Sequence, residues 1–87
     1  QQIHAESENA AVKINFFATQ VYAVMGNTSA TPIHVKVMLN GKWLPSAELT
    51  VNRYNLYTVI SLPKAQRGEL TLQFDKPGVD LYTFTFG

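Results

Sequence analysis

Few residues in this sequence have the types and spacing that acid–base or nucleophilic chemistry requires. The 87 residues include no cysteine, and the two histidines, His4 and His34, stand apart from any serine or aspartate pattern typical of a catalytic triad. We interpret both as solvated surface histidines. A glycoside hydrolase needs two carboxylates held roughly 5–9.5 Å apart in a cleft. The acids here are scattered over predicted turns and strand ends, so we expect no enzyme activity: Glu6, Glu8, Glu48, Glu69, Asp75 and Asp80.

Asp75 and Asp80 flank a predicted loop and could together hold a structural calcium ion. An aspartate beside a turn more often bonds to nearby backbone groups, and we favour that interpretation. The glycines are separate turn residues, with no phosphate-binding pattern among them. We therefore expect neither a metal nor a cofactor.

Aromatic side chains are the more informative candidates, because sugars bind to flat ring faces that have polar groups around them. Near the predicted loops, the available rings are those of Trp43, Tyr54 and Tyr57. The competing interpretation is core packing, since aromatic residues supply much of the core of a small β domain. We favour the core for Tyr57 and for three aromatic residues of the last strand, and leave both interpretations open for Trp43; the three are Tyr82, Phe84 and Phe86.

Charge and hydropathy exclude two kinds of partner. The formal net charge is +1, from seven basic and six acidic residues with no run of either sign. Nucleic-acid binding needs a basic stripe, which this sequence lacks. No segment reaches the roughly 18 consecutive apolar residues of a membrane span, so we expect no direct membrane insertion. The charged fraction of 15% is low for a globular chain and favours a β-rich domain.

The end of the chain has the clearest strand pattern. Leu70, Leu72 and Phe74 alternate with polar residues, and a second alternating segment covers residues 82–86. The sequence Lys76-Pro77-Gly78 between them is typical of a turn. We predict a hairpin of two strands here, as the core pair on which the other strands assemble.

Further strands precede it. Residues 12–25 are rich in β-branched and aromatic side chains, which predicts two strands, 12–18 and 20–25, kinked near Thr19, with the second in a central position. Residues 33–39 alternate and lead into Asn40-Gly41, the pair that a type I′ hairpin turn favours. That turn places Trp43 opposite Met38 on the outer face, whereas a slip of one residue would bury the indole.

Two more short strands are predicted at 48–51 and 56–62, the second with Tyr57 and Val59 on one face and Leu56, Thr58 and Ile60 on the other. Residues 63–68 are predicted to form a polar loop. The total is seven or eight short strands with no significant helix, which indicates an antiparallel β-sandwich or barrel. We expect one domain, residues 11–87, after a polar linker formed by residues 1–10.

The pattern L-x-L-x-F-x-x-P-G-V-x-x-Y-x-F-T-F-G at residues 70–87 resembles the C-terminal domain of DipZ-type thiol:disulfide interchange proteins, which are cytochrome c biogenesis and thioredoxin-like proteins. Three blocks agree with it: Phe16–Ala18 with Val21–Met25, Leu39–Lys42, and Leu56-Tyr57. The resemblance covers about residues 11–87.

This resemblance implies a jelly-roll-like sandwich similar to galactose-binding domains and carbohydrate-binding modules. In that family it follows a membrane-embedded electron-transfer domain and a thioredoxin-like domain. The family's Cys-x-x-Cys motif lies in the thioredoxin-like part, so no catalytic residue is carried over. The resemblance also implies a periplasmic or extracytoplasmic location in a membrane-anchored parent, and one or two further sandwich strands before Gln1.

The implied function is non-catalytic binding of a glycan or another cell-envelope polymer. The alternative is a protein-interaction module that docks on the thioredoxin-like domain or its clients, or that forms a homodimer through an open edge strand. Exposed coplanar aromatic rings in a concave face would favour a sugar, and a flat apolar patch would favour a protein. The predicted ligand site combines ring platforms and hydrogen-bonding partners: Trp43, Tyr54, Tyr57, Asn52, Arg53 and Asn55.

Overall fold

The computed structural model describes residues 3–4 and 10–87 and confirms the all-β antiparallel prediction. In these residues the one helical segment is a single 3₁₀ turn, and no helix among them is long and apolar enough to cross a membrane. Most of the predicted linker, residues 1–2 and 5–9, lies outside the described residues. The elements are β1 (Ile3–His4), β2 (Ala11–Asn27), β3 (Ile33–Leu39), β4 (Lys42–Trp43), the 3₁₀ turn η1 (Pro45–Ala47), β5 (Leu49–Val51), β6 (Asn55–Phe74) and β7 (Val79–Phe86).

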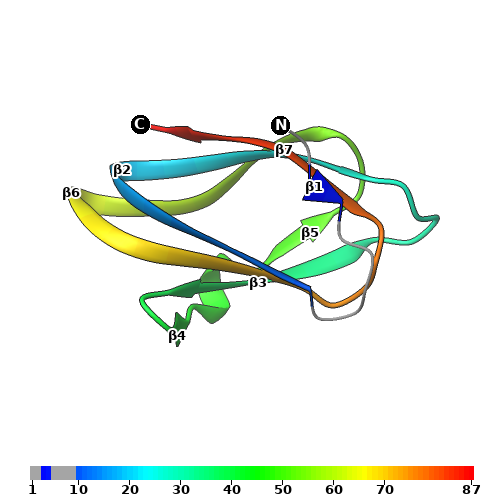
Figure 1. Cartoon of the computed structure of the whole chain (residues 1–87), viewed down its shortest axis with the longest axis horizontal. Helices are drawn as coiled ribbons and strands as arrows, with labels where there is room; N and C mark the ends of the chain where they lie inside the picture. Colours follow the sequence, from blue (N-terminus) through cyan, green and yellow to red (C-terminus); the bar gives the residue numbers. More distant parts are fainter. Residues whose placement is uncertain (1–2, 5–9) are drawn as a thin grey trace.

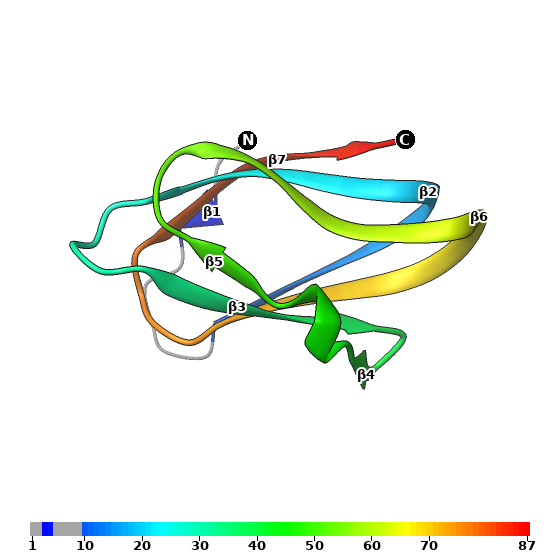
Figure 2. The ribbon, with the colours of Figure 1, turned by 180° about the vertical axis from the view of Figure 1, so that it is seen from behind.

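Two long strands, β2 and β6, build both layers of a β-sandwich. Residues 11–18 of β2 pair with residues 66–73 of β6 in one layer, and residues 20–25 pair with residues 55–61 in the other. Figures 1 and 2 show the two strands turning over together at one end of the molecule. The layer that is upper in Figure 1 adds β7 and β1, and the lower layer adds β3 with β4 and β5 beside it.

The bend between the layers is a large irregularity in strand pairing. Ala18 pairs with Gln66 and Gln20 pairs with Ser61, so Thr19 faces four residues of β6. The kink predicted near Thr19 is confirmed, although it bends one strand. The predicted polar loop at residues 63–68 is wrong, because the extra β6 residues span the outside of the bend while the strand continues. The chain end secures this corner: the Thr19 N–H donates to the Gly87 carbonyl at 2.9 Å.

The predicted C-terminal hairpin is also wrong. β6 ends in the lower layer and β7 lies in the upper layer, where it pairs with residues 21–27 of β2. Alternation predicts each strand correctly but does not identify its partner. Residues 70–73 of β6 are already paired with β2 on one side and β3 on the other, so no edge is free for β7. Residues 75–78 therefore carry the chain from one layer to the other.

The core lies between the layers and consists mainly of alternating side chains of the four longest strands. Phe74, Leu70 and Leu72 are buried, as their alternation predicts. Phe86, which the alternation predicts to be in the core, is 49% exposed because it lies at the end of the edge strand β7. The buried apolar residues are Phe16, Ala18, Val21, Ala23, Met25, Ile33, Val35, Val37, Val51, Val59, Ile60, Leu70, Leu72, Phe74, Val79 and Leu81.

Local irregularities decide which residues face the core. Val21 pairs with Ile60, but the next residue, Tyr22, pairs with Thr58, so Val59 is an extra residue in β6. This bulge turns both Val59 and Ile60 inward. The prediction that Ile60 lies on the same face as Leu56 and Thr58, opposite Val59, is therefore wrong, because period-two alternation breaks at a bulge.

The hairpin predicted at Asn40-Gly41 is confirmed. Asn40 has φ 52° and Gly41 has φ 82°, the two positive values that a type I′ turn requires. Met38 pairs with Trp43, as predicted, and the indole is 51% exposed on the outer face of the lower layer.

Asn27 fixes the loop that connects β2 with β3, and its loss should destabilise the domain. Its Nδ2 donates to the Thr31 and Val51 carbonyls, both at 2.8 Å, and its Oδ1 accepts from the N–H and hydroxyl of Ser29. We expect Asn27→Ala to lower the free energy of unfolding by about 1–3 kcal/mol in chemical denaturation. The control Asn52→Ala, in an exposed turn, should change it by less than about 0.5 kcal/mol. Equal effects of the two substitutions would contradict this role.

Candidate ligand-binding face

The structure separates the predicted ring platforms. Trp43 lies on β4 in the lower layer, whereas Tyr54 lies in the turn that enters β6 in the upper layer. Tyr57 pairs with the buried Ala23, so it faces the interior, where it packs against the core. The three rings therefore do not form one site. The turn that carries Tyr54 does bring together the other predicted residues, Asn52, Arg53 and Asn55.

Tyr57 anchors this turn. Its hydroxyl donates to the Arg53 carbonyl at 2.7 Å, which ties the turn to the inner side of β6. Asn55 Oδ1 accepts from the Leu56 N–H at 2.8 Å and orders the start of the strand. The packing of Tyr57 against the core confirms the core interpretation for this residue. The Tyr57 hydroxyl holds the chain just before Tyr54.

Tyr54 meets a second tyrosine, Tyr82, across the outer face of the upper layer. The ring centroids are 5.3 Å apart and the ring planes are inclined by 70°, an edge-to-face contact. Both rings flank Gly26: a Cβ built there would lie 3.4 Å from Tyr82 Cε2 and 3.8 Å from Tyr54 Cδ1. Tyr54 is nevertheless 67% exposed, so Tyr82 supports its ring and leaves much of it open to solvent.

A bulge in β7 places Tyr82 on the outside. Val24 pairs with Thr83 and Met25 pairs with Leu81, so Tyr82 is an extra residue between two paired positions. Leu81 turns inward and is buried, and Tyr82 lies over Gly26. The core prediction for Tyr82 is therefore wrong, since alternation with Phe84 put it on the inner face. Gly26, which has no side chain and so leaves room for a ring, is the one sequence signal that could have indicated the outer position of Tyr82.

The register places further residues beside this tyrosine pair. Leu56, Val24 and Thr83 form one row across three strands, and Thr58, Tyr22 and Thr85 form the next. The Tyr22 hydroxyl donates to Gln20 Oε1. We call this surface the tyrosine face; it consists of Tyr22, Val24, Tyr54, Leu56, Thr58, Tyr82, Thr83 and Thr85.

The exposed side chains of the tyrosine face combine ring surfaces with hydroxyl groups and are uncharged, while Asp80, which pairs with Gly26 on the same side of the sheet, is buried. Tyr22 and Gly26 are four residues apart on β2, so the two aromatic positions are separated by roughly 13 Å. A ligand that contacts both must be extended, such as a short oligosaccharide. Arg53 and Asn55, exposed in the adjoining turn, add hydrogen-bonding groups at one end.

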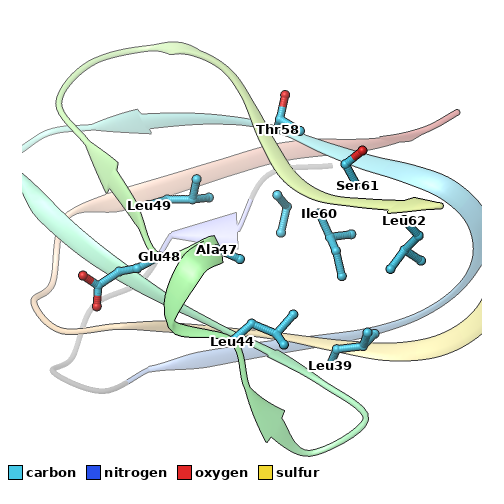
Figure 3. A pocket seen from close by; sticks show the side chains of 10 residues that line it. Leu39, Leu44, Ala47, Glu48, Leu49, Thr58, Ile60, Ser61 and Leu62 are labelled. Carbon is cyan, nitrogen blue, oxygen red and sulfur yellow. The ribbon is translucent and has the colours of Figure 1, made fainter.

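A groove of about 380 Å³ opens between the layers on the other side of β6. Figure 3 shows Leu44, Ile60 and Leu62 pointing into it, and the Glu48 carboxylate pointing away. Glu48 is the single titratable residue in its lining, so the groove has no pair of carboxylates for hydrolysis. It is an apolar opening between an edge strand and η1.

Asp75 bonds to backbone, as the favoured interpretation predicts. Its Oδ1 accepts from the His34 N–H at 3.0 Å. Among the residues that the structure describes, no three His, Cys, Asp or Glu side chains are grouped as metal ligands. The structure thus offers no arrangement of described residues that favours a calcium site.

Comparison with known families identifies the domain. The family model described as thioredoxin-like C-terminal domain matches residues 1–87. The chain therefore belongs to this family of β domains. Among curated protein sequences the comparison found no match.

Similar folds occur within larger enzymes. A family two carbohydrate esterase from Clostridium thermocellum, in complex with cellohexaose, matches with a TM-score of 0.80 and 15% identity, over 100% of this chain and 31% of the esterase. A family two carbohydrate esterase from Cellvibrio japonicus matches with a TM-score of 0.72 and 7% identity, over 95% of this chain and 25% of that one. The chain thus spans about a third or less of these structures, and at these identities the likeness concerns the fold.

Proposed function

We propose that this domain is a non-catalytic binding module whose tyrosine face holds a neutral oligosaccharide of the cell envelope. The observation that carries the proposal is the exposed ring of Tyr54, in edge-to-face contact with Tyr82, on a face whose exposed side chains are uncharged and rich in hydroxyl groups. A pyranose ring presents C–H groups that pack on an aromatic face, and its hydroxyls exchange hydrogen bonds with threonine and tyrosine hydroxyls.

The parent protein in this proposal is an extracytoplasmic thiol:disulfide interchange protein of the DipZ type. The resemblance of the C-terminal pattern and the membership of the thioredoxin-like C-terminal family support it. The absence of cysteine in this chain is consistent with a parent that carries its redox motif in another domain. The module would then hold the membrane-anchored parent near envelope polymers.

A second candidate function is docking of the thioredoxin-like domain on the same face. Leu56 is 54% exposed beside the half-buried Val24, and such an apolar patch is typical of a protein contact. The edge-to-face rings also fall short of the coplanar platform expected for a sugar site. Titration with an isolated thioredoxin-like domain distinguishes the candidates, because a docking surface would respond to that protein and not to oligosaccharide.

Removal of one ring tests the first proposal. We expect Tyr54→Ala to weaken the binding of cellohexaose, used as a neutral probe, by about tenfold, which corresponds to about 1.4 kcal/mol. The matched control is Phe17→Ala, because Phe17 is 62% exposed but lies in the lower layer. Isothermal titration calorimetry should show unchanged affinity for this control. Equal losses in both variants, or no binding to the unmodified domain, would count against the proposal.

A further inference from the structure

Trp43 is an exposed aromatic side chain that the tyrosine face leaves unexplained. The hairpin that carries it is fixed by other groups: the Leu44 N–H donates to the Val37 carbonyl at 2.9 Å, and the Asn40 N–H donates to the Glu69 carbonyl at 2.8 Å. A further bond runs from the Glu69 N–H to Asn40 Oδ1 at 2.9 Å. The fold thus positions the indole firmly while leaving it 51% exposed.

The surface around the indole is cationic. Lys36 Nζ lies 5.4 Å from the centroid of the Trp43 ring, within the range of a cation–π contact. The register places Trp43, Met38, Thr71 and Lys13 in one row across four strands, roughly 14 Å from end to end. Thr71 is buried although it is on the outer face, so the side chains beside it form a continuous surface.

Few acids offset these lysines. Within residues 10–87, the strands of the lower layer place one carboxylate, Glu69, on this outer face. A second, the exposed Glu48, directly precedes Leu49, which pairs with Val35 next to Lys36. Asp75, at the end of β6, is bonded to the backbone of His34. The ammonium groups of Lys13 and Lys36 are therefore available to an external anion.

We propose that this tryptophan face, which consists of Lys13, Lys36, Met38, Trp43 and Thr71, is a second binding site that takes an acidic saccharide. A sugar ring packs on the part of the indole that Lys36 leaves exposed, and its carboxylate pairs with the Lys36 ammonium that lies over the ring. Lys13, at the far end of the row, pairs with a second carboxylate further along the saccharide. A neutral sugar lacks both ion pairs, and a simple anion lacks the stacking contact.

The site shares no residue with the tyrosine face, and its centre at Trp43 lies on the outer side of the other layer. At its far end, Lys13 lines a pocket of about 310 Å³ together with Tyr82 and Thr83, so the two faces approach each other there. The binding of an acidic polymer here would stand even if the tyrosine face bound no sugar. The two sites also differ in their response to salt. Binding at the tryptophan face uses ion pairs between exposed groups and should weaken as ionic strength rises, whereas binding of a neutral sugar at the tyrosine face should not.

The test compares two saccharides of equal length, hexagalacturonate and cellohexaose, by calorimetry and by NMR titration of the ¹⁵N-labelled domain. We expect hexagalacturonate to shift the Trp43 indole signal and to bind about tenfold more weakly to Lys36→Gln. Trp43→Ala should reduce binding at least as much. Lys64→Gln, which removes one exposed lysine near the bend of β6, should leave the affinity within about twofold.

Each outcome separates this proposal from the proposed function. A Trp43 shift with hexagalacturonate that is weaker at high salt supports the acidic-saccharide site, whatever cellohexaose does at Tyr54. Equal losses in Lys36→Gln and Lys64→Gln would show binding by net charge alone and would overturn it. So would binding of inorganic sulfate with the same shifts and affinity, or hexagalacturonate shifts confined to the tyrosine face.

Discussion

Replacing Phe74 by alanine is expected to lower the free energy of unfolding by about 3–5 kcal/mol, the usual cost of emptying a buried phenylalanine site. Phe74 is 1% exposed and is the largest of the fully buried side chains. Its strand is paired on both sides near this position: Phe74 itself pairs with Val35 of β3, and the preceding Gln73 pairs with Ala11 of β2. The surrounding backbone is therefore held by two neighbours and has little freedom to close the cavity.

A matched phenylalanine in β7, the next strand along the chain, provides the control. Phe86 ends β7 and is 49% exposed, so Phe86→Ala should cost less than about 1 kcal/mol. Urea denaturation monitored by circular dichroism measures both. If Phe86→Ala lowered the free energy of unfolding as much as Phe74→Ala, Phe86 would have to be buried, which would contradict the described arrangement.

Replacing Gly78 by alanine is expected to cost about 2–4 kcal/mol, because two penalties combine. Gly78 has φ 119°, a conformation that residues with a Cβ rarely adopt. A Cβ there would also lie 3.2 Å from Ser29 Cβ and 3.3 Å from Ile33 Cδ1. The Gly78 carbonyl accepts from the Thr28 N–H at 2.9 Å, so the crossing chain cannot move away without losing this bond.

Gly41 separates the two penalties. It also has a positive φ, 82°, but no atom lies within 4 Å of a Cβ built on it. Gly41→Ala should therefore show the conformational cost alone, about 1–2 kcal/mol. If thermal or urea denaturation gives the same loss for both glycines, crowding at the crossover does not contribute.

The sequence predicts local features of this fold well and strand partners poorly. Alternation over residues 33–39 matches β3, and Asn40-Gly41 predicts both the hairpin and its register. The partner of the last strand could not be predicted in the same way. Residues 76–78 look like a tight turn, yet they cross between layers because both edges of β6 are occupied by strands from earlier in the chain.

The candidate site shows the same limit. The turn with Asn52, Arg53, Tyr54 and Asn55 was predicted as a ligand site, and the structure places these residues together. The sequence predicts Tyr82 in the core and not on this face, because a one-residue bulge changes which side chains of β7 face the core. The alternation of polar and apolar residues in one sequence does not reveal where a bulge occurs. Ligand binding by any of these residues stays a prediction.

The two proposed faces give the module different roles for its two layers. The exposed side chains of the tyrosine face are uncharged and suit a neutral saccharide, whereas the tryptophan face has Lys36 over its indole and Lys13 at the far end of the row. A domain that holds one envelope polymer on each side would anchor its parent more firmly than either site alone, provided that both can be occupied together.

The most direct test of the account is a titration of the ¹⁵N-labelled domain with cellohexaose, followed residue by residue by NMR. We expect saturable shifts at Tyr22, Tyr54, Leu56 and Tyr82, with Phe17 of the lower layer and the groove residue Leu44 unaffected. If cellohexaose causes no shifts on the tyrosine face, while an isolated thioredoxin-like domain does, the face is a docking surface and the glycan-binding account is wrong.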